Sequence, residues 1–257
     1  MASSTQTLDP MIVWLDIHIA LPDFCRTLKK AFATTINPEH ELPTTIDEKD
    51  IENLICEQTD SHETTFHEIP FIFKLFNDLD ACYKYLLDNA GKKRIFLITS
   101  GTLGQYLVPK ILERDQYIFQ DRNGKLYEHS IYIFCADMAA NAQWAEDFLD
   151  LDCIQMYNDE RLILSHLTQH VAKYFISEGE QLLANEEIES IDEKIELAKK
   201  AEQYFTWAKT LYIKADSVWK GSLTEDLLHT LDKLIKSAQM RIKPLDKLRD
   251  GNGEEML

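Results

Sequence analysis

Hydrophobic residues in the first 157 positions gather in short, nearly continuous runs, which is the pattern of strands buried on both faces of a sheet. These runs cover residues 11–17, 69–76, 94–99, 130–135 and 153–157. The run at 94–99 is followed by Ser100 and Gly101 and then by a helical pattern through 102–112. This strand, turn and helix are expected to form the centre of the fold.

The segments between the runs carry apolar residues at helical spacing, and strands that alternate with helices predict a parallel sheet. Helices are expected at 22–35, 47–56, 78–90, 102–112 and 141–149, and a turn at 121–124. The polar stretch 37–67 is interpreted as an insertion or a long crossover, mostly at the surface. We therefore predict an α/β fold with a five-stranded doubly wound parallel sheet in the order 2-1-3-4-5, which short right-handed crossovers favour.

After residue 157 the strand pattern gives way to long helical stripes. Three helices are expected at 158–183, 193–219 and 223–242, with an acidic connector at 184–192. Pro244 is expected to help end the third helix. The predicted domains are an α/β domain at 11–157 and an all-α bundle at 158–243, with flexible tails at 1–10 and 244–257.

The charge of the chain narrows the classes of partner. Its formal net charge is −17, which argues against nonspecific binding to nucleic acid or to anionic membranes, because both need clustered Lys and Arg. No apolar run approaches the roughly 20 residues of a membrane helix. We therefore expect neither a nucleic-acid nor a membrane partner.

The cysteines indicate a cellular compartment. The chain has five cysteines and no CxxC pair, and most of them lie in apolar segments. An odd number of buried thiols is typical of a protein in a reducing environment. A cytoplasmic protein is the expectation.

The SGTLG stretch at 100–104 is the best candidate for a ligand site. Gly101 is expected to allow a tight turn, Thr102 to cap the following helix, and Gly104 to lie in its first turn. The free N–H groups and positive dipole of a helix start suit an anion or phosphate. A purely structural turn with a Thr102 cap is the alternative, and it is preferred because GxxG alone is a weak signal.

Three acidic residues, Asp16, Asp137 and Asp159, follow predicted strands at the same edge of the sheet. In the predicted order Asp16 lies beside Ser100, where a carboxylate and a hydroxyl could bind a metal ion or ribose hydroxyls. The preferred alternative is that each aspartate caps the next helix.

Catalytic and metal-binding motifs give little support for an enzyme. His166 and His170 are four residues apart, but the glutamate of HExxH and a third ligand are missing. No nucleophile elbow or Walker motif occurs. No catalytic residue, metal or cofactor is therefore predicted.

Residues 11–157 resemble receiver-like and TIR-like modules of the flavodoxin type. The resemblance rests on VWLD at 13–16, NDLDACYKYL at 77–86 and IFLITSG at 95–101. A phosphoacceptor receiver has paired acids after strand one, where this chain has only Asp16. It has an acceptor aspartate after strand three, where Thr99 and Ser100 stand, so phosphotransfer is not expected.

The position that matches the receiver lysine after strand five holds Asn158 and Asp159, which also departs from that pattern. For the TIR-type NAD hydrolases, Glu113 and Glu146 are the nearest options for the catalytic glutamate, and neither lies in a matching motif. The resemblance therefore implies the fold of these modules more than their chemistry.

A more specific resemblance adds SGTLG, SIYIFC at 130–135 and QWAEDF at 143–148. Together these segments look like an uncharacterised module that precedes ADP-ribosyltransferase or TPR-repeat regions in some multidomain animal proteins. In the helical half, Ala201, Phe205 and Ala208 have the spacing of the second helix of a TPR unit. One unit cannot form a solenoid, so a TPR-like or three-helix bundle is expected.

These observations favour a noncatalytic regulatory or scaffold protein in signalling, which binds a protein partner through its helical half. The alternative is an NAD-related, nucleotide-binding enzyme or sensor that uses the SGTLG loop to hold a nucleotide or another anion. The candidate ligand-binding residues for that alternative are Asp16, Ser100, Gly101, Thr102, Gly104 and Asp137.

Overall fold

A computed structural model describes residues 9–21, 23–35, 44–56, 64–148, 151–185, 190–221 and 223–251. The chain divides into two compact units, here called the α/β unit (Leu8–Leu164) and the helical unit (Ser165–Leu257). Most of the predicted N-terminal tail, residues 252–257 of the predicted C-terminal tail, the centre of the acidic connector and parts of the predicted insertion lie outside the described residues.

The α/β unit is built on a parallel sheet of five strands. They are β1 (Asp9–Leu15), β6 (Ile72–Phe76), β7 (Lys93–Ser100), β8 (Ile131–Phe134) and β9 (Ile154–Tyr157). Their order is β6-β1-β7-β8-β9, which confirms the predicted 2-1-3-4-5 arrangement. In register, Trp14 of β1 lies opposite Leu75 of β6 and Ile98 of β7.

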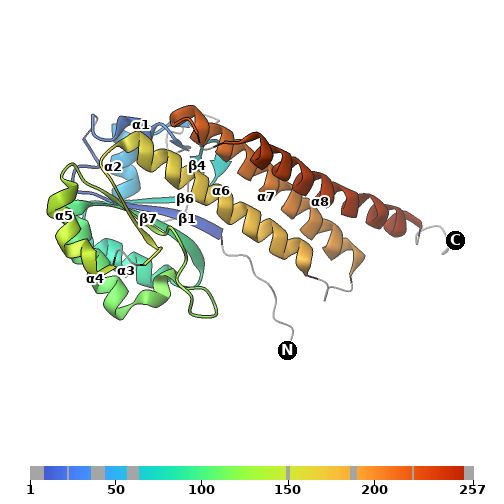
Figure 1. Ribbon diagram of the computed structural model, residues 1–257, viewed down its shortest axis with the longest axis horizontal. Helices are drawn as coiled ribbons and strands as arrows, with labels where there is room; N and C mark the ends of the chain where they lie inside the picture. The colour runs from blue at the N-terminus through green and yellow to red at the C-terminus, as the bar shows by residue number, and fades with distance from the viewer. Residues whose placement is uncertain are drawn as a thin grey trace. The chain divides into compact units, whose positions relative to one another are not determined.

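Two helices cover one face of this sheet, α3 (Leu79–Asn89) and α4 (Gly101–Arg114) (Figure 1). Their apolar sides pack on inward-facing strand residues such as Val13, Leu97 and Ile133, all with no exposed surface. Because β7 lies at the centre, six consecutive residues of this strand are buried. The continuous apolar pattern of residues 94–99 reflects this burial on both faces.

A small antiparallel sheet packs its aromatic rings on the other face of the large one. Its strands are β2 (Phe32–Thr34), β3 (Thr44–Thr45), β4 (Thr64–Phe66) and β5 (Ile69–Pro70), in the order β3-β2-β4-β5. The Phe32 ring stacks on Phe73 at a centroid distance of 4.0 Å, and it lies 5.0 Å from Phe66 and 6.5 Å from Trp14.

The helix predicted over 22–35 is wrong for the described part of that range. Only one helical turn forms, α1 (Arg26–Lys29), and the chain then enters β2. Burial of the Phe32 ring against β6 outweighs the local helical spacing, since aromatic burial contributes more than intrinsic propensity. The predicted strand 69–76 is likewise divided, because β5 pairs with β4 and only β6 joins the large sheet.

Several shorter predictions are confirmed or adjusted. The predicted helix at 47–56 is α2 (Glu48–Cys56), and the turn at 121–124 closes a bridge between Gln120 and Leu126. The helix α5 (Met138–Ala145) begins three residues before the predicted start at 141. Two short 3-10 helices, η1 (Gln116–Phe119) and η2 (Glu146–Phe148), follow α4 and α5.

Three long helices follow β9: α6 (Glu160–Ala184), α7 (Ile191–Val218) and α8 (Glu225–Gly251). The first turn of α6 belongs to the α/β unit, and the rest packs with α7 and α8 in the helical unit (Figure 1). The predicted end of α8 near Pro244 is wrong, because α8 continues through this proline. A proline removes a single backbone donor, and a helix can continue past that lost bond.

Cys25, Cys82, Cys135 and Cys153 are free and buried, which agrees with the expectation for these four thiols. The side chain of Cys56 lies outside the described residues. Within the part of the chain that the structure describes, no helix combines the length and apolar character needed to cross a bilayer.

Candidate functional site

The carboxyl edge of the large sheet brings Asp16, Ser100 and Asp137 to the ends of β1, β7 and β8. Leu15 pairs with Thr99 across β1 and β7, so Asp16 and Ser100 follow directly after two paired residues. Ser100 and Phe134 pair in the same way across β7 and β8. The structure therefore places the candidate residues along one edge, as their positions after the strands predict.

Ser100, rather than Thr102, caps α4. The Ser100 Oγ accepts a hydrogen bond from the Leu103 N–H at 3.4 Å, and the helix begins at Gly101. Thr102 lies exposed in the first turn, so the predicted Thr102 cap is wrong. The reason is that α4 follows β7 without an intervening loop. Ser100 is therefore the last extended residue before the helix, and its side chain can accept a bond from an N–H of the first turn.

Gly101 is required for space and not for a tight turn, contrary to the prediction. Its φ is not positive, but an added Cβ would lie 2.4 Å from Asn141 Oδ1 and 2.8 Å from Cys135 Cβ. At Gly104 an added Cβ would lie 3.1 Å from Thr99 Cγ2. Both glycines of the SGTLG stretch therefore allow close packing at the sheet edge and between α4 and α5.

Asp137 and Asn141 organise the start of α5. The Asp137 carboxylate accepts the Ala140 N–H at 3.0 Å, which makes it the N-cap that the capping alternative predicts. Asn141 Nδ2 donates to the Asp137 carbonyl at 2.8 Å, and Asn141 Oδ1 accepts the Trp144 indole N–H at 3.2 Å. Asn141 is thus fixed against Gly101, although it was not among the residues predicted at this edge.

Asp16 is almost fully buried, with 1% of its surface exposed. Its Oδ1 accepts the His18 N–H at 2.7 Å. Burial raises the pKa of this carboxyl, and the bond from the His18 N–H opposes that rise. The side chain therefore stabilises the turn that follows β1, and it has little accessible surface left to bind a ribose or a metal ion.

Side chains that follow β1 extend along the sheet edge. The Phe24 ring lies 6.4 Å from the ring of Phe134 at the end of β8. Thr27 donates from its N–H and its hydroxyl to the two carboxylate oxygens of Glu160, at 3.0 and 2.8 Å. Because Glu160 begins α6 shortly after β9, the segment after β1 contacts both the end of β8 and the start of the helix that follows β9.

Two ionisable side chains of the segment after β1 are also buried. Lys29 is 5% exposed, its Nζ donates to the Leu21 carbonyl at 2.6 Å, and burial lowers its pKa. Burial, with a smaller contribution from Glu160, raises the pKa of Cys25 to about 12. A thiol with this pKa is protonated at neutral pH and is a poor nucleophile.

No group of three or more His, Cys, Asp or Glu residues in the described ranges is arranged to hold a metal ion. His166 and His170 lie with their ring centroids 6.0 Å apart on α6. Burial lowers the pKa of His166. This pair gives no support for a metal site.

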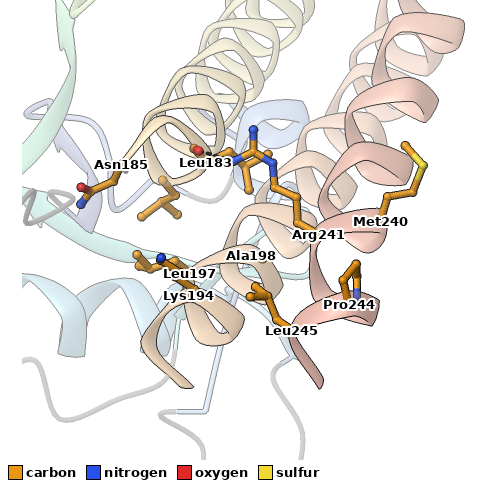
Figure 2. Close-up of a pocket in the computed structure, with 10 residues that line it drawn as sticks. Leu183, Asn185, Lys194, Leu197, Ala198, Met240, Arg241, Pro244 and Leu245 are labelled. Atoms are coloured by element: carbon orange, nitrogen blue, oxygen red, sulfur yellow. Dashed lines mark hydrogen bonds between the residues drawn. The ribbon is translucent and has the colours of Figure 1, made fainter. Parts of the chain in front are cut away.

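A second candidate site is a pocket of about 460 Å3 in the helical unit. Ten of the described residues line it, from the end of α6, the start of α7 and the last turns of α8 (Figure 2). Seven are apolar, and Asn185, Lys194 and Arg241 are the polar members. Partner binding was predicted for the helical half, but none of these residues was among the predicted site residues.

Substitution of Gly101 by alanine is expected to destabilise the protein by roughly 1–3 kcal/mol, because the new methyl group overlaps Asn141 and Cys135. Without this overlap, alanine would favour the helix by about 1 kcal/mol, so the sign of the change is informative. Denaturant unfolding measures it.

The Gly101→Ala/Asn141→Ala double variant should lose less stability than the sum of its two single variants, since one of the overlapping side chains is removed. A Gly101→Ala variant as stable as the wild type would contradict the packing described for this edge.

Comparison of the chain with protein-family models, with curated proteins and with solved structures found no match. The parallel five-stranded sheet is flavodoxin-like in its strand order. The resemblance to a receiver or TIR module stays a prediction, as does anion binding at residues 100–104.

Proposed function

We propose that this protein is a noncatalytic regulatory or scaffold protein whose helical unit binds a protein partner. The observation that carries the proposal is the covered carboxyl edge of the sheet. Sheets of this order bind small ligands beyond the carboxyl ends of the strands, at the point where the strand order reverses. Here that point lies between β1 and β7, where Asp16 is buried and Asn141 packs on Gly101.

The chemistry of this edge supports a structural role over catalysis. Asp137 and Ser100 act as helix caps, and Glu160 accepts two hydrogen bonds from Thr27. The raised pKa of Cys25 leaves no activated thiol at this position. These groups hold the connections between strands and helices together, and each already has a role in the fold.

The helical unit supports the second half of the proposal. Its surface carries large exposed apolar side chains, with Ile213 47% and Met240 57% exposed, and it contains the pocket between α6, α7 and α8. Met240 also lines the pocket, and exposed apolar side chains are typical of a protein-binding site.

A thermal-shift panel with NAD, ADP-ribose, ATP and Mg²⁺ tests the noncatalytic half. A ligand at 100 times its Kd would stabilise the fold by about 2.7 kcal/mol, and we expect no such shift. A shift that is lost in Asp16→Asn would instead assign a nucleotide to this edge and overturn the proposal.

Photo-crosslinking tests the partner half. A photoreactive amino acid replaces Ile213 in the helical unit or, as the control, the 64% exposed Tyr106 in the α/β unit. The expected result is that position 213 crosslinks reproducibly to one partner protein and that position 106 gives no crosslink to it. Crosslinks confined to position 106 would place the partner on the α/β unit.

A further inference from the structure

The pocket of the helical unit has a local charge opposite to that of the whole chain. The chain carries a net charge of −17, yet the described residues that line the pocket include two cations, Lys194 and Arg241, and no acidic residue. Among the described residues, neither cation has a carboxylate oxygen within ion-pair distance. An acidic group that enters this pocket therefore meets two positive charges and no repulsion from the lining.

Arg241 is held in position by a backbone contact. Its Nη1 donates to the carbonyl of Leu183 in the last turn of α6 (Figure 2). A guanidinium has five N–H donors, so donors remain for a ligand. Because α8 supplies the side chain and α6 the carbonyl, the bond fixes the guanidinium beside the pocket before any ligand arrives.

Apart from Asn185, the remainder of the described lining is apolar. It includes the buried Leu182, the exposed Met240, and Pro244, which has no N–H to offer. About 460 Å3 lies within the range of pockets that bind small ligands, so the pocket has room for a large apolar side chain. The pocket thus combines a site for an apolar side chain with two cations beside it.

Building on the proposed function, we infer that this pocket binds a partner peptide segment that carries a large apolar anchor residue with Glu or Asp beside it. An amphipathic helix that presents leucines and glutamates on one face has this chemistry, and helices commonly bind in grooves between other helices. Charge-assisted hydrogen bonds from Arg241 and Lys194 to the carboxylates would orient the segment. The exposed rim at Met240 favours a segment that covers the pocket over an acyl chain that would stay partly in water.

A fluorescein-labelled helical peptide of leucine and glutamate, with leucine at i, i+3, i+4 and i+7, is the probe. Fluorescence anisotropy measures its binding to the full chain. A matched peptide with glutamine in place of glutamate should bind at least about tenfold more weakly, because the charge-assisted bonds are lost. Equal affinity for the two peptides would overturn the inference.

Variants assign the binding to the pocket. Lys194→Gln and Arg241→Glu should each weaken binding of the glutamate-containing peptide, and Arg241→Glu should weaken it by about tenfold or more. Lys243→Glu is the control, because it makes the same charge change as Arg241→Glu two residues away on a different side of α8. Lys194→Gln removes a charge that forms no ion pair with another described residue, so it tests the pocket even if Arg241→Glu disturbs the helix.

Further results would also contradict the inference. An equal loss with Lys243→Glu would show a general charge effect, and no peptide binding at all would exclude a peptide of this chemistry. Binding of oleate that depends on Lys194 and Arg241, without peptide binding, would reassign the pocket to acyl carboxylates. If pocket variants leave the crosslinks from position 213 unchanged, the scaffold proposal stands while this inference fails.

Discussion

Replacement of Ile98 by aspartate should unfold the α/β unit. Ile98 has no exposed surface and lies in β7, between Trp14 of β1 and Tyr132 of β8 in the strand register. An unpaired carboxylate at this position costs several kcal/mol, which is comparable with the 5–15 kcal/mol that stabilises a typical domain. Near-ultraviolet circular dichroism and guanidinium unfolding measure the outcome.

The conservative variant Ile98→Val separates burial of charge from loss of volume. It should cost only about 0.5–1.5 kcal/mol, because one buried methylene is removed and no charge is introduced. If Ile98→Asp melted at the wild-type temperature, the central position of β7 would be wrong.

Substitution of Gly179 by leucine should disrupt the packing of α6 on α7. An added Cβ would lie 2.6 Å from Phe205 Cε1 and 2.9 Å from its Cζ, and Phe205 has no exposed surface. Leucine favours helices over glycine, so any loss of stability must come from this overlap. We expect a loss of roughly 1–3 kcal/mol or more by chemical denaturation.

Two controls define the cause of that loss. Ala184→Leu, on the exposed side of the same helix, should change stability by less than about 0.5 kcal/mol. The Gly179→Leu/Phe205→Ala double variant should be more stable than the sum of its single changes, because the ring that overlaps is gone. Additive effects would mean that the two residues do not meet.

The large sheet could be predicted from the sequence because its order follows from strand burial and short crossovers. β7 shows this most directly, since burial on both faces leaves a continuous apolar run at 94–99. The small sheet could not be predicted in the same way. Its strands have two or three residues each, and Phe32 owes its extended conformation to a ring stack with the distant Phe73.

The candidate site at the carboxyl edge could also be predicted only in part. The positions of Asp16 and Ser100 could be predicted, because parallel strands end at one edge and the pairing of β1 with β7 was part of the predicted order. The groups that cover the edge could not, since Thr27 and Glu160 are 133 residues apart in the sequence. Asn141 was missed because a packing contact with a glycine has no local sequence signal.

The distribution of the cysteines has a practical consequence for chemical labelling. All five precede residue 154, so Ser165–Leu257 contains no thiol. In the native protein burial keeps Cys82 and Cys153 protonated, with the pKa of Cys153 raised to about 11. An alkylating reagent such as iodoacetamide therefore reaches these two sulfurs only when the α/β unit opens. Their rate of modification reports the opening of the α/β unit, and the helical unit contributes no signal.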